Sequence, residues 1–125
     1  MYKKTLVYLL LLYLLGTACA PYTKSDLAGK WQVLSLTEDG DSLAVDLALI
    51  NFQFSEDGYY HFNSTLNYEE SGTYRLNGPF LYSTDTLDSP HREKAVKIVL
   101  LRNDSLVLKM EEMGRERLVV LRREK

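Results

Sequence analysis

The chain has 125 residues, of which 46% are hydrophobic and 26% charged, and this balance favours one folded domain over a disordered chain. A formal net charge of −2 provides no basic surface for nucleic acid, so we expect no nucleic-acid partner. The single cysteine excludes an intramolecular disulfide and a cysteine-rich metal site.

The N-terminal segment has the pattern of an export signal. Lys3 and Lys4 precede an apolar block over residues 6–15, which is typical of a secretory signal peptide. Ten helical residues span about 15 Å, roughly half of the hydrocarbon core of a bilayer. The block is therefore predicted to direct export, and to contribute nothing to the core of the folded domain.

The small residues that follow lead directly into the only cysteine. The segment Leu15-Gly16-Thr17-Ala18-Cys19 resembles the lipobox of bacterial lipoproteins, with Gly16 where the family usually has leucine. The resemblance implies that residues 1–18 are removed as a signal peptide and that Cys19 carries acyl chains. Residues 19–24 then form an acylated tether, and the membrane is a partner through the lipid on Cys19.

Ordinary cleavage after Ala20, at an A-x-A site over residues 18–20, is the alternative. Pro21 would then follow the cut directly, where proline usually blocks ordinary signal peptidases. No acidic run follows Cys19, unlike in lipoproteins exported to the cell surface in some bacteria. The lipobox resemblance therefore implies a lipid-anchored protein of the bacterial cell envelope, on the periplasmic face of the outer membrane.

The rest of the chain alternates apolar and polar residues, with turn signals about every ten residues, which is typical of an all-β sandwich or barrel. Asp57-Gly58 and Asn77-Gly78 are strong hairpin turns. Eight antiparallel strands joined mainly by hairpins favour an up-and-down barrel. The predicted strands cover residues 30–37, 51–55, 59–64, 71–76, 80–82, 94–102, 105–111 and 116–122.

Three segments lie outside this strand pattern. Residues 25–28 are predicted to form a helical turn with Ser25 as its N-cap. Residues 43–50 fit a helix or an extension of strand equally well, at a place where a lid over a barrel mouth would lie. Residues 83–90 are polar and rich in turn formers, which predicts a loop.

Several motifs together resemble the lipocalin-like domains of small bacterial lipoproteins, over about residues 25–125. The resemblance implies an eight-stranded lipocalin-like barrel, and Gly29-Lys30-Trp31 is similar to the G-x-W element of the lipocalins proper. The matching elements are Leu27 to Trp31, Phe52-x-Phe54-x-x-x-Gly58, Gly72-x-Tyr74 and Asn103-Asp104-Ser105-Leu106-x-Leu108.

In lipocalins the tryptophan of G-x-W plugs the closed end of the barrel, and an arginine near the chain end lies over it as a cation–π partner. The resemblance therefore implies that Gly29 and Trp31 form a structural plug. Arg122 and Arg123 are the two candidates for the arginine. The alternative is that Trp31 is simply a core aromatic, and both interpretations are structural.

The aromatic residues in the middle of the domain are the candidate ligand contacts: Phe52, Phe54, Tyr60, Phe62 and Tyr74. They predict either an aromatic-lined ligand site or the filling of a solid core. Two functions follow. The barrel binds a small apolar or amphipathic molecule, or it is filled and docks a protein of the envelope through its surface.

No catalytic constellation is visible in the sequence. His61 and His91 are the only histidines; His61 faces away from Tyr60 and Phe62 and His91 lies in the polar loop, so both are predicted to be solvated rather than part of a serine-type triad. Adjacent residues of a strand point to opposite faces, so neither Glu69-Glu70 nor Glu111-Glu112 forms an acid/base pair, and both pairs are predicted to be solvated. The sequence therefore predicts a protein that is not an enzyme and that uses no metal or cofactor.

Overall fold

The computed structural model describes residues 22–87 and 92–125. The predicted signal peptide, Cys19 and His91 lie outside these ranges. The described part contains a short helix α2 (Lys24–Leu27) and a 3-10 turn η1 (Leu47–Leu49). Its strands are β1 (Gly29–Glu38), β2 (Asp41–Ser42), β3 (Asn51–Phe54), β4 (Tyr59–Asn63), β5 (Glu69–Asn77), β6 (Phe80–Asp85), β7 (Glu93–Arg102), β8 (Ser105–Glu112) and β9 (Arg115–Arg123).

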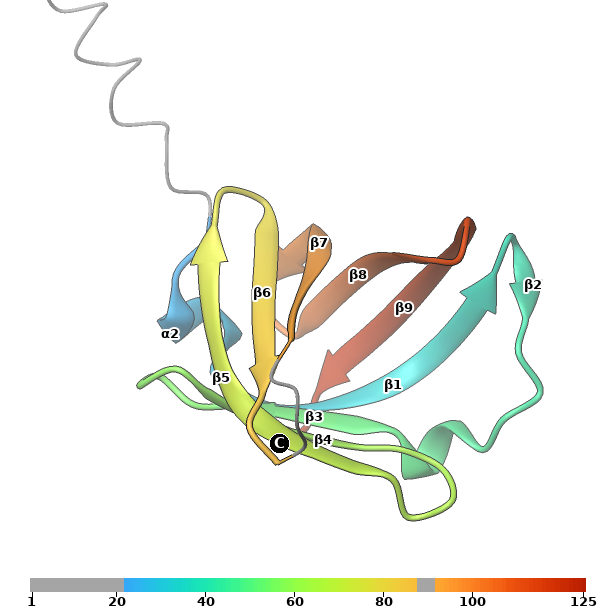
Figure 1. Cartoon of the computed structure of the whole chain (residues 1–125), viewed down its shortest axis with the longest axis horizontal. Coiled ribbons are helices and arrows are strands. Elements are labelled where there is room, and N and C mark those ends of the chain that lie inside the picture. The colour runs from blue at the N-terminus through green and yellow to red at the C-terminus, as the bar shows by residue number, and fades with distance from the viewer. Residues whose placement is uncertain (1–21, 88–91) are drawn as a thin grey trace, which may run out of the picture.

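The strands form a closed antiparallel barrel (Figure 1). From β3 to β9 each strand pairs with the next along the chain, and β1 pairs with both β3 and β9. The closing pair runs from Trp31 opposite Arg123 to Glu38 opposite Arg117. The predicted all-β, up-and-down, eight-stranded barrel is therefore confirmed. The two-residue strand β2, which pairs only with the end of β1, is an addition to it.

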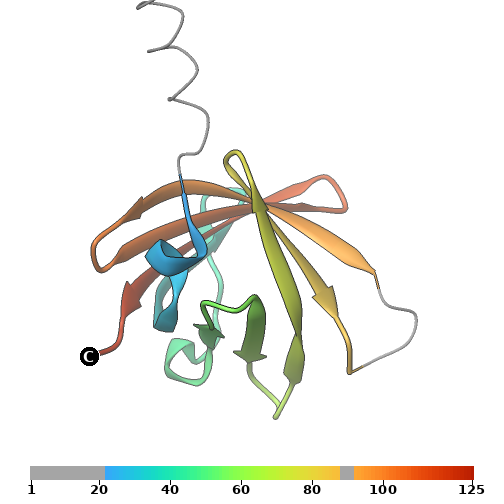
Figure 2. The ribbon, with the colours of Figure 1, turned by 90° about the vertical axis from the view of Figure 1, so that its left-hand side faces the viewer.

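The two ends of the barrel differ. At the left-hand end in Figure 1, α2 lies beside the start of β1, and Figure 2 views this end with α2 in the foreground. Leu27 of α2 is fully buried in the core. We call this the closed end. The opposite end, where β1 turns into β2 and β8 into β9, is the open end.

The helical turn begins one residue earlier than predicted, and Ser25 is not its cap. The N-cap is Thr23, whose hydroxyl accepts from the backbone N–H of Asp26, while the Asp26 carboxylate accepts from the N–H of Thr23. This reciprocal capping box satisfies two backbone donors that a Ser25 cap would leave free. Thr23 and Lys24, assigned to the tether from sequence, thus belong to the folded domain.

Two other segments differ from the sequence prediction. Ser83, Thr84 and Asp85 belong to β6 rather than to a loop, because all three pair with β5, and Ser83 and Thr84 also pair with β7. Residues 43–50 form neither a helix nor a strand extension, but a loop with the single turn η1. The Gln32 side chain holds this loop on β1, since its amide donates to the carbonyls of Leu47 and Ile50 at 2.7 and 3.1 Å.

The barrel interior holds one apolar core, built from the inward-facing residues of successive strands. Its fully buried members include Trp31, Ile98, Leu106, Leu108 and Leu121. Gly72 of β5 faces the same interior, opposite Tyr60 of β4. A Cβ atom at Gly72 would lie 1.8 Å from the carbonyl oxygen of Thr84. Strands β5 and β6 can therefore approach this closely only with glycine at the position.

Candidate functional site

The barrel brings the five candidate aromatic residues together on its inner wall. Phe52 lies opposite Phe62, and Phe54 lies opposite Tyr60, on the neighbouring strands β3 and β4. The Phe52 and Phe62 rings stack with centroids 4.4 Å apart, and Phe54 meets Tyr74 edge-on at 5.2 Å. These side chains therefore form one contiguous cluster.

The five side chains of the cluster differ in how deeply they are buried. Phe54, Tyr60 and Tyr74 are buried, whereas Phe52 and Phe62 are half-buried. The Tyr74 hydroxyl donates to the carbonyl oxygen of Ser55 at 2.5 Å, and burial raises the pKa of Tyr74 to about 12. The buried members fill the barrel like core residues, so only Phe52 and Phe62 remain available to a ligand.

Glu70 is the main residue that sequence reasoning missed. It was predicted to be solvated, and this is wrong, since its side chain is only 9% exposed. Glu70 lies opposite Phe62 and therefore points into the barrel, while its neighbour Glu69 points outward and meets His61 at 3.0 Å. The strand begins at Glu69 rather than Ser71, so the alternation that places Gly72 and Tyr74 inside also places Glu70 inside.

Three donors surround the buried carboxylate of Glu70. The Tyr60 hydroxyl donates to Oε2 at 3.0 Å, and the Tyr68 hydroxyl donates to Oε1 at 3.3 Å. The Lys94 ammonium, from β7, donates to Oε1 at 3.0 Å. A buried charge is stable only when it is paired and hydrogen-bonded in this way. We call Tyr60, Tyr68, Glu70 and Lys94 the Glu70 cluster.

The pKa values of the cluster follow from these contacts. Burial is the largest cause of the raised pKa of Tyr60, and the Glu70 charge adds to it. The pKa of Tyr68 is raised in the same direction by the same two causes. The hydrogen bond to Glu70 raises the pKa of Lys94. At neutral pH both tyrosines are therefore neutral donors, and Lys94 is a cation.

Inward-facing apolar side chains at the open end stay partly exposed. They pack against the core on one side and are partly exposed to solvent on the other. The end of the barrel opposite α2 therefore has an apolar surface. We call these residues the mouth: Leu36, Phe52, Phe62, Val96 and Met110.

A second charged group lies at the rim of the mouth. Glu38 at the end of β1 meets Arg115 at 3.3 Å and Arg117 at 3.8 Å, and Arg117 also meets Glu112 at 3.6 Å. The Nε of Arg117 is buried without a hydrogen-bond partner in the described structure. Further acidic residues lie in and beside the turns at this end, namely Asp39, Asp41, Glu111 and Glu116, and Glu116 meets Lys109 at 3.5 Å.

At the closed end, Trp31 and Gly29 are placed together with one of the two candidate arginines. Trp31 is fully buried, and its indole N–H donates to the carbonyl oxygen of Leu27 at 2.8 Å. The Arg123 guanidinium lies over the indole ring, 4.3 Å from its centroid. Gly29 lies directly beneath Arg123, because a Cβ there would lie 2.8 Å from the guanidinium.

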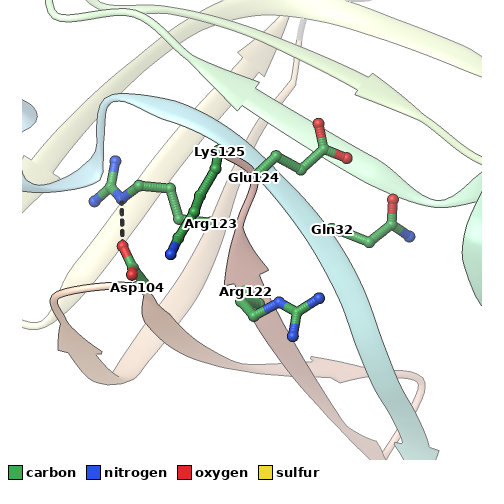
Figure 3. A pocket seen from close by; sticks show the side chains of 6 residues that line it. All are labelled: Gln32, Asp104, Arg122, Arg123, Glu124 and Lys125. Carbon is green, nitrogen blue, oxygen red and sulfur yellow. Dashed lines mark ion pairs between the residues drawn. The ribbon is translucent and has the colours of Figure 1, made fainter.

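Arg123 also ties the segments around the plug together. Its guanidinium donates to the carbonyl oxygens of Ala28, Asp26 and Asn103, the last two at 2.7 and 3.3 Å. Its Nε lies 3.7 Å from Asp104 (Figure 3). Register explains the choice of arginine, since Arg123 lies opposite Trp31 whereas Arg122 lies opposite Gln32 on the outward face.

None of the five candidate aromatic residues lines either of two surface cavities in the described structure. A cavity of about 690 Å³ lies at the closed end, with Arg123 and Asp104 on one side and Gln32 on the other (Figure 3). The remaining residues that line it are Arg122, Glu124 and Lys125. A cavity of about 390 Å³ lies beside the β4–β5 turn, lined by Leu49, Asn63, Ser64, Leu66, Asn67, Tyr68 and Glu69.

No protein-family model matches the chain, and no curated protein matches it. Among solved structures, the chain is similar to an uncharacterized protein from Bacteroides eggerthii, with a TM-score of 0.55 and 19% sequence identity. The match covers 78% of this chain and 98% of that chain. At this identity the likeness shows the barrel fold and nothing further.

Within residues 22–87 and 92–125, no helix is long and apolar enough to cross a membrane. The same residues contain no group of three or more histidine, cysteine or carboxylate side chains that could hold a metal ion. The ligand contacts, the lipid on Cys19 and the lack of enzymatic activity remain predictions.

Proposed function

We infer that the protein is a lipid-anchored protein of the bacterial envelope, whose lipocalin-like barrel binds a small amphipathic molecule at its mouth. This proposal rests on a difference in burial along the inner wall of the barrel. The inward-facing side chains are buried at the closed end and partly exposed at the mouth. Apolar surface beside a few fixed polar groups is the usual composition of a small-molecule site. The mouth and the Glu70 cluster supply these two parts.

The position of the first described residues supports one orientation of the barrel relative to the membrane. The described structure begins with Tyr22, next to α2 at the closed end. Three residues span at most about 11 Å, so an acylated Cys19 would hold the closed end close to the bilayer. The mouth would then face away from the membrane, into the periplasm if the anchor lies in the outer membrane.

Cys19→Ser is expected to release the protein from the membrane fraction, because a protein anchored by several acyl chains depends on their burial at about 0.8 kcal/mol per CH₂. The intact mass of the wild-type protein, extracted in mild detergent, should fit an acylated chain that begins at Cys19. A matched variant, Thr23→Ser, preserves the helix cap and should stay in the membrane. An unmodified Cys19 thiol in the mature protein would contradict the lipid anchor.

Native mass spectrometry of the protein from the same detergent extraction tests whether it carries a ligand. A small molecule that is released from the protein by collisional activation would support binding at the mouth. A co-purified protein without any small molecule would favour a filled barrel that docks an envelope protein. The exposed apolar residues Leu34, Val99 and Leu100 on the outside of the barrel favour this second candidate function.

A further inference from the structure

The Glu70 cluster contains a cation that reaches its partner from solvent. The Glu70 side chain is 9% exposed, whereas the Lys94 side chain, which ends 3.0 Å from it, is 61% exposed. Lys94 lies opposite Ser83, which lies opposite Tyr74, so its side chain faces the interior and passes β6 to reach Glu70 of β5. Because this side chain is largely exposed, the position of its ammonium group is accessible to a ligand at the mouth, although the carboxylate itself is buried.

An aromatic surface adjoins the same carboxylate. Phe62 lies directly opposite Glu70 across the β4–β5 pair. Its ring contacts that of Tyr68 edge-on at 6.1 Å and stacks on Phe52 at 4.4 Å. Cations are attracted to aromatic faces, and alkyl chains pack on them. A carboxylate that accepts an ammonium group therefore lies next to an aromatic surface on which an apolar tail can pack.

We propose that the mouth binds amphipathic primary amines, with the ligand's ammonium taking the place of the Lys94 ammonium on Glu70 and its apolar tail lying on Phe62 and Phe52. This inference rests on the proposed function, because it assigns a ligand class to the same mouth. Lys94 is the built-in competitor: when a ligand enters, its flexible side chain turns out into solvent, and the Tyr60 and Tyr68 hydroxyls continue to donate to Glu70.

The chemistry of the cluster favours an amine over other amphiphiles. A carboxylate-bearing ligand would meet the like charge of Glu70, which costs free energy at a site of low exposure. A neutral alcohol could donate a hydrogen bond, but would leave the buried charge without a counter-ion once Lys94 had moved away.

Three probes with one alkyl chain test the proposal: hexylammonium, 1-hexanol and hexanoate. They are titrated into the mature chain carrying Cys19→Ser, which keeps every described residue. Hexylammonium is expected to bind about tenfold more tightly than 1-hexanol, since a hydrogen bond between charged groups adds at least this factor. Glu70→Gln should remove the preference.

Lys94→Met provides a second, independent readout. The variant leaves Glu70 without its cation, so we expect a lower melting temperature that hexylammonium restores and 1-hexanol does not. It should also bind hexylammonium about tenfold more tightly than the protein with Lys94, because the competitor is gone. Lys97→Met, which removes an outward-facing lysine from the same strand, is the matched control and should show neither effect.

The outcomes separate this inference from the function on which it rests. If all three probes bind with equal affinity and Glu70→Gln changes nothing, the mouth binds amphiphiles but the amine assignment is wrong. Tighter binding of hexanoate would overturn it in the same way. If none of the probes binds to the protein or to Lys94→Met, the proposed ligand function fails together with the inference.

Discussion

Trp31→Ala is expected to lower the free energy of unfolding by about 3–5 kcal/mol, the usual cost of deleting a buried large aromatic side chain. The variant removes a fully buried indole and its hydrogen bond to Leu27. It also leaves the Arg123 guanidinium without the ring that lies 4.3 Å away. Because small domains unfold at a total cost of about 5–15 kcal/mol, much of the stability would be lost.

Chemical denaturation followed by circular dichroism measures this effect. Tyr59→Ala is the matched control, because Tyr59 is an aromatic residue near the same end whose side chain is mostly exposed. It should cost less than about 1 kcal/mol, as surface substitutions usually do. A Trp31→Ala protein as stable as Tyr59→Ala would show that the closed end is not held by this plug.

Gly72→Ala is expected to cost about 3 kcal/mol, at the upper end of the usual range for overpacking. The added methyl group would lie 1.8 Å from the Thr84 carbonyl oxygen, and this contact is with backbone rather than with a side chain that could move. Strands β5 and β6 would have to separate, which disturbs the register that places Glu70 and Tyr60 together.

The control for this variant is Thr73→Ala, at the exposed neighbouring position of the same strand. It keeps the interior unchanged and should cost about 1 kcal/mol at most. Equal stability of the two variants in urea denaturation would mean that β5 and β6 can separate at this point without loss. The close approach at Gly72 would then not determine how the barrel closes.

The fold could be predicted from sequence because its signals are local. Alternation with a period of two, interrupted by turns such as Asn77-Gly78, identifies each strand without reference to its neighbours. The prediction failed at residues 83–85, because a polar composition there suggested a loop. All three residues pair with β5 and two of them also pair with β7, and pairing depends on partners that lie elsewhere in the sequence.

The candidate site was less predictable, because its chemistry depends on contacts between distant residues. The burial of Glu70 depends on a cation 24 residues later in the chain and on a hydroxyl ten residues earlier. A stretch of sequence around Glu69-Glu70 contains neither partner, so a solvated pair was the natural interpretation. The choice between Arg122 and Arg123 likewise needed the register of β1 and β9.

If an amphipathic ligand enters the barrel at its mouth, the two methionines of the folded domain, Met110 and Met113, report its binding directly. Met110 faces inward at the mouth, whereas Met113 lies in the β8–β9 turn and is 97% exposed. With the methionine methyl groups labelled with ¹³C, we expect titration with hexylammonium to shift the Met110 signal saturably and to leave that of Met113 unchanged. Shifts of Met113 alone, or no saturable shift of Met110, would contradict binding at the mouth.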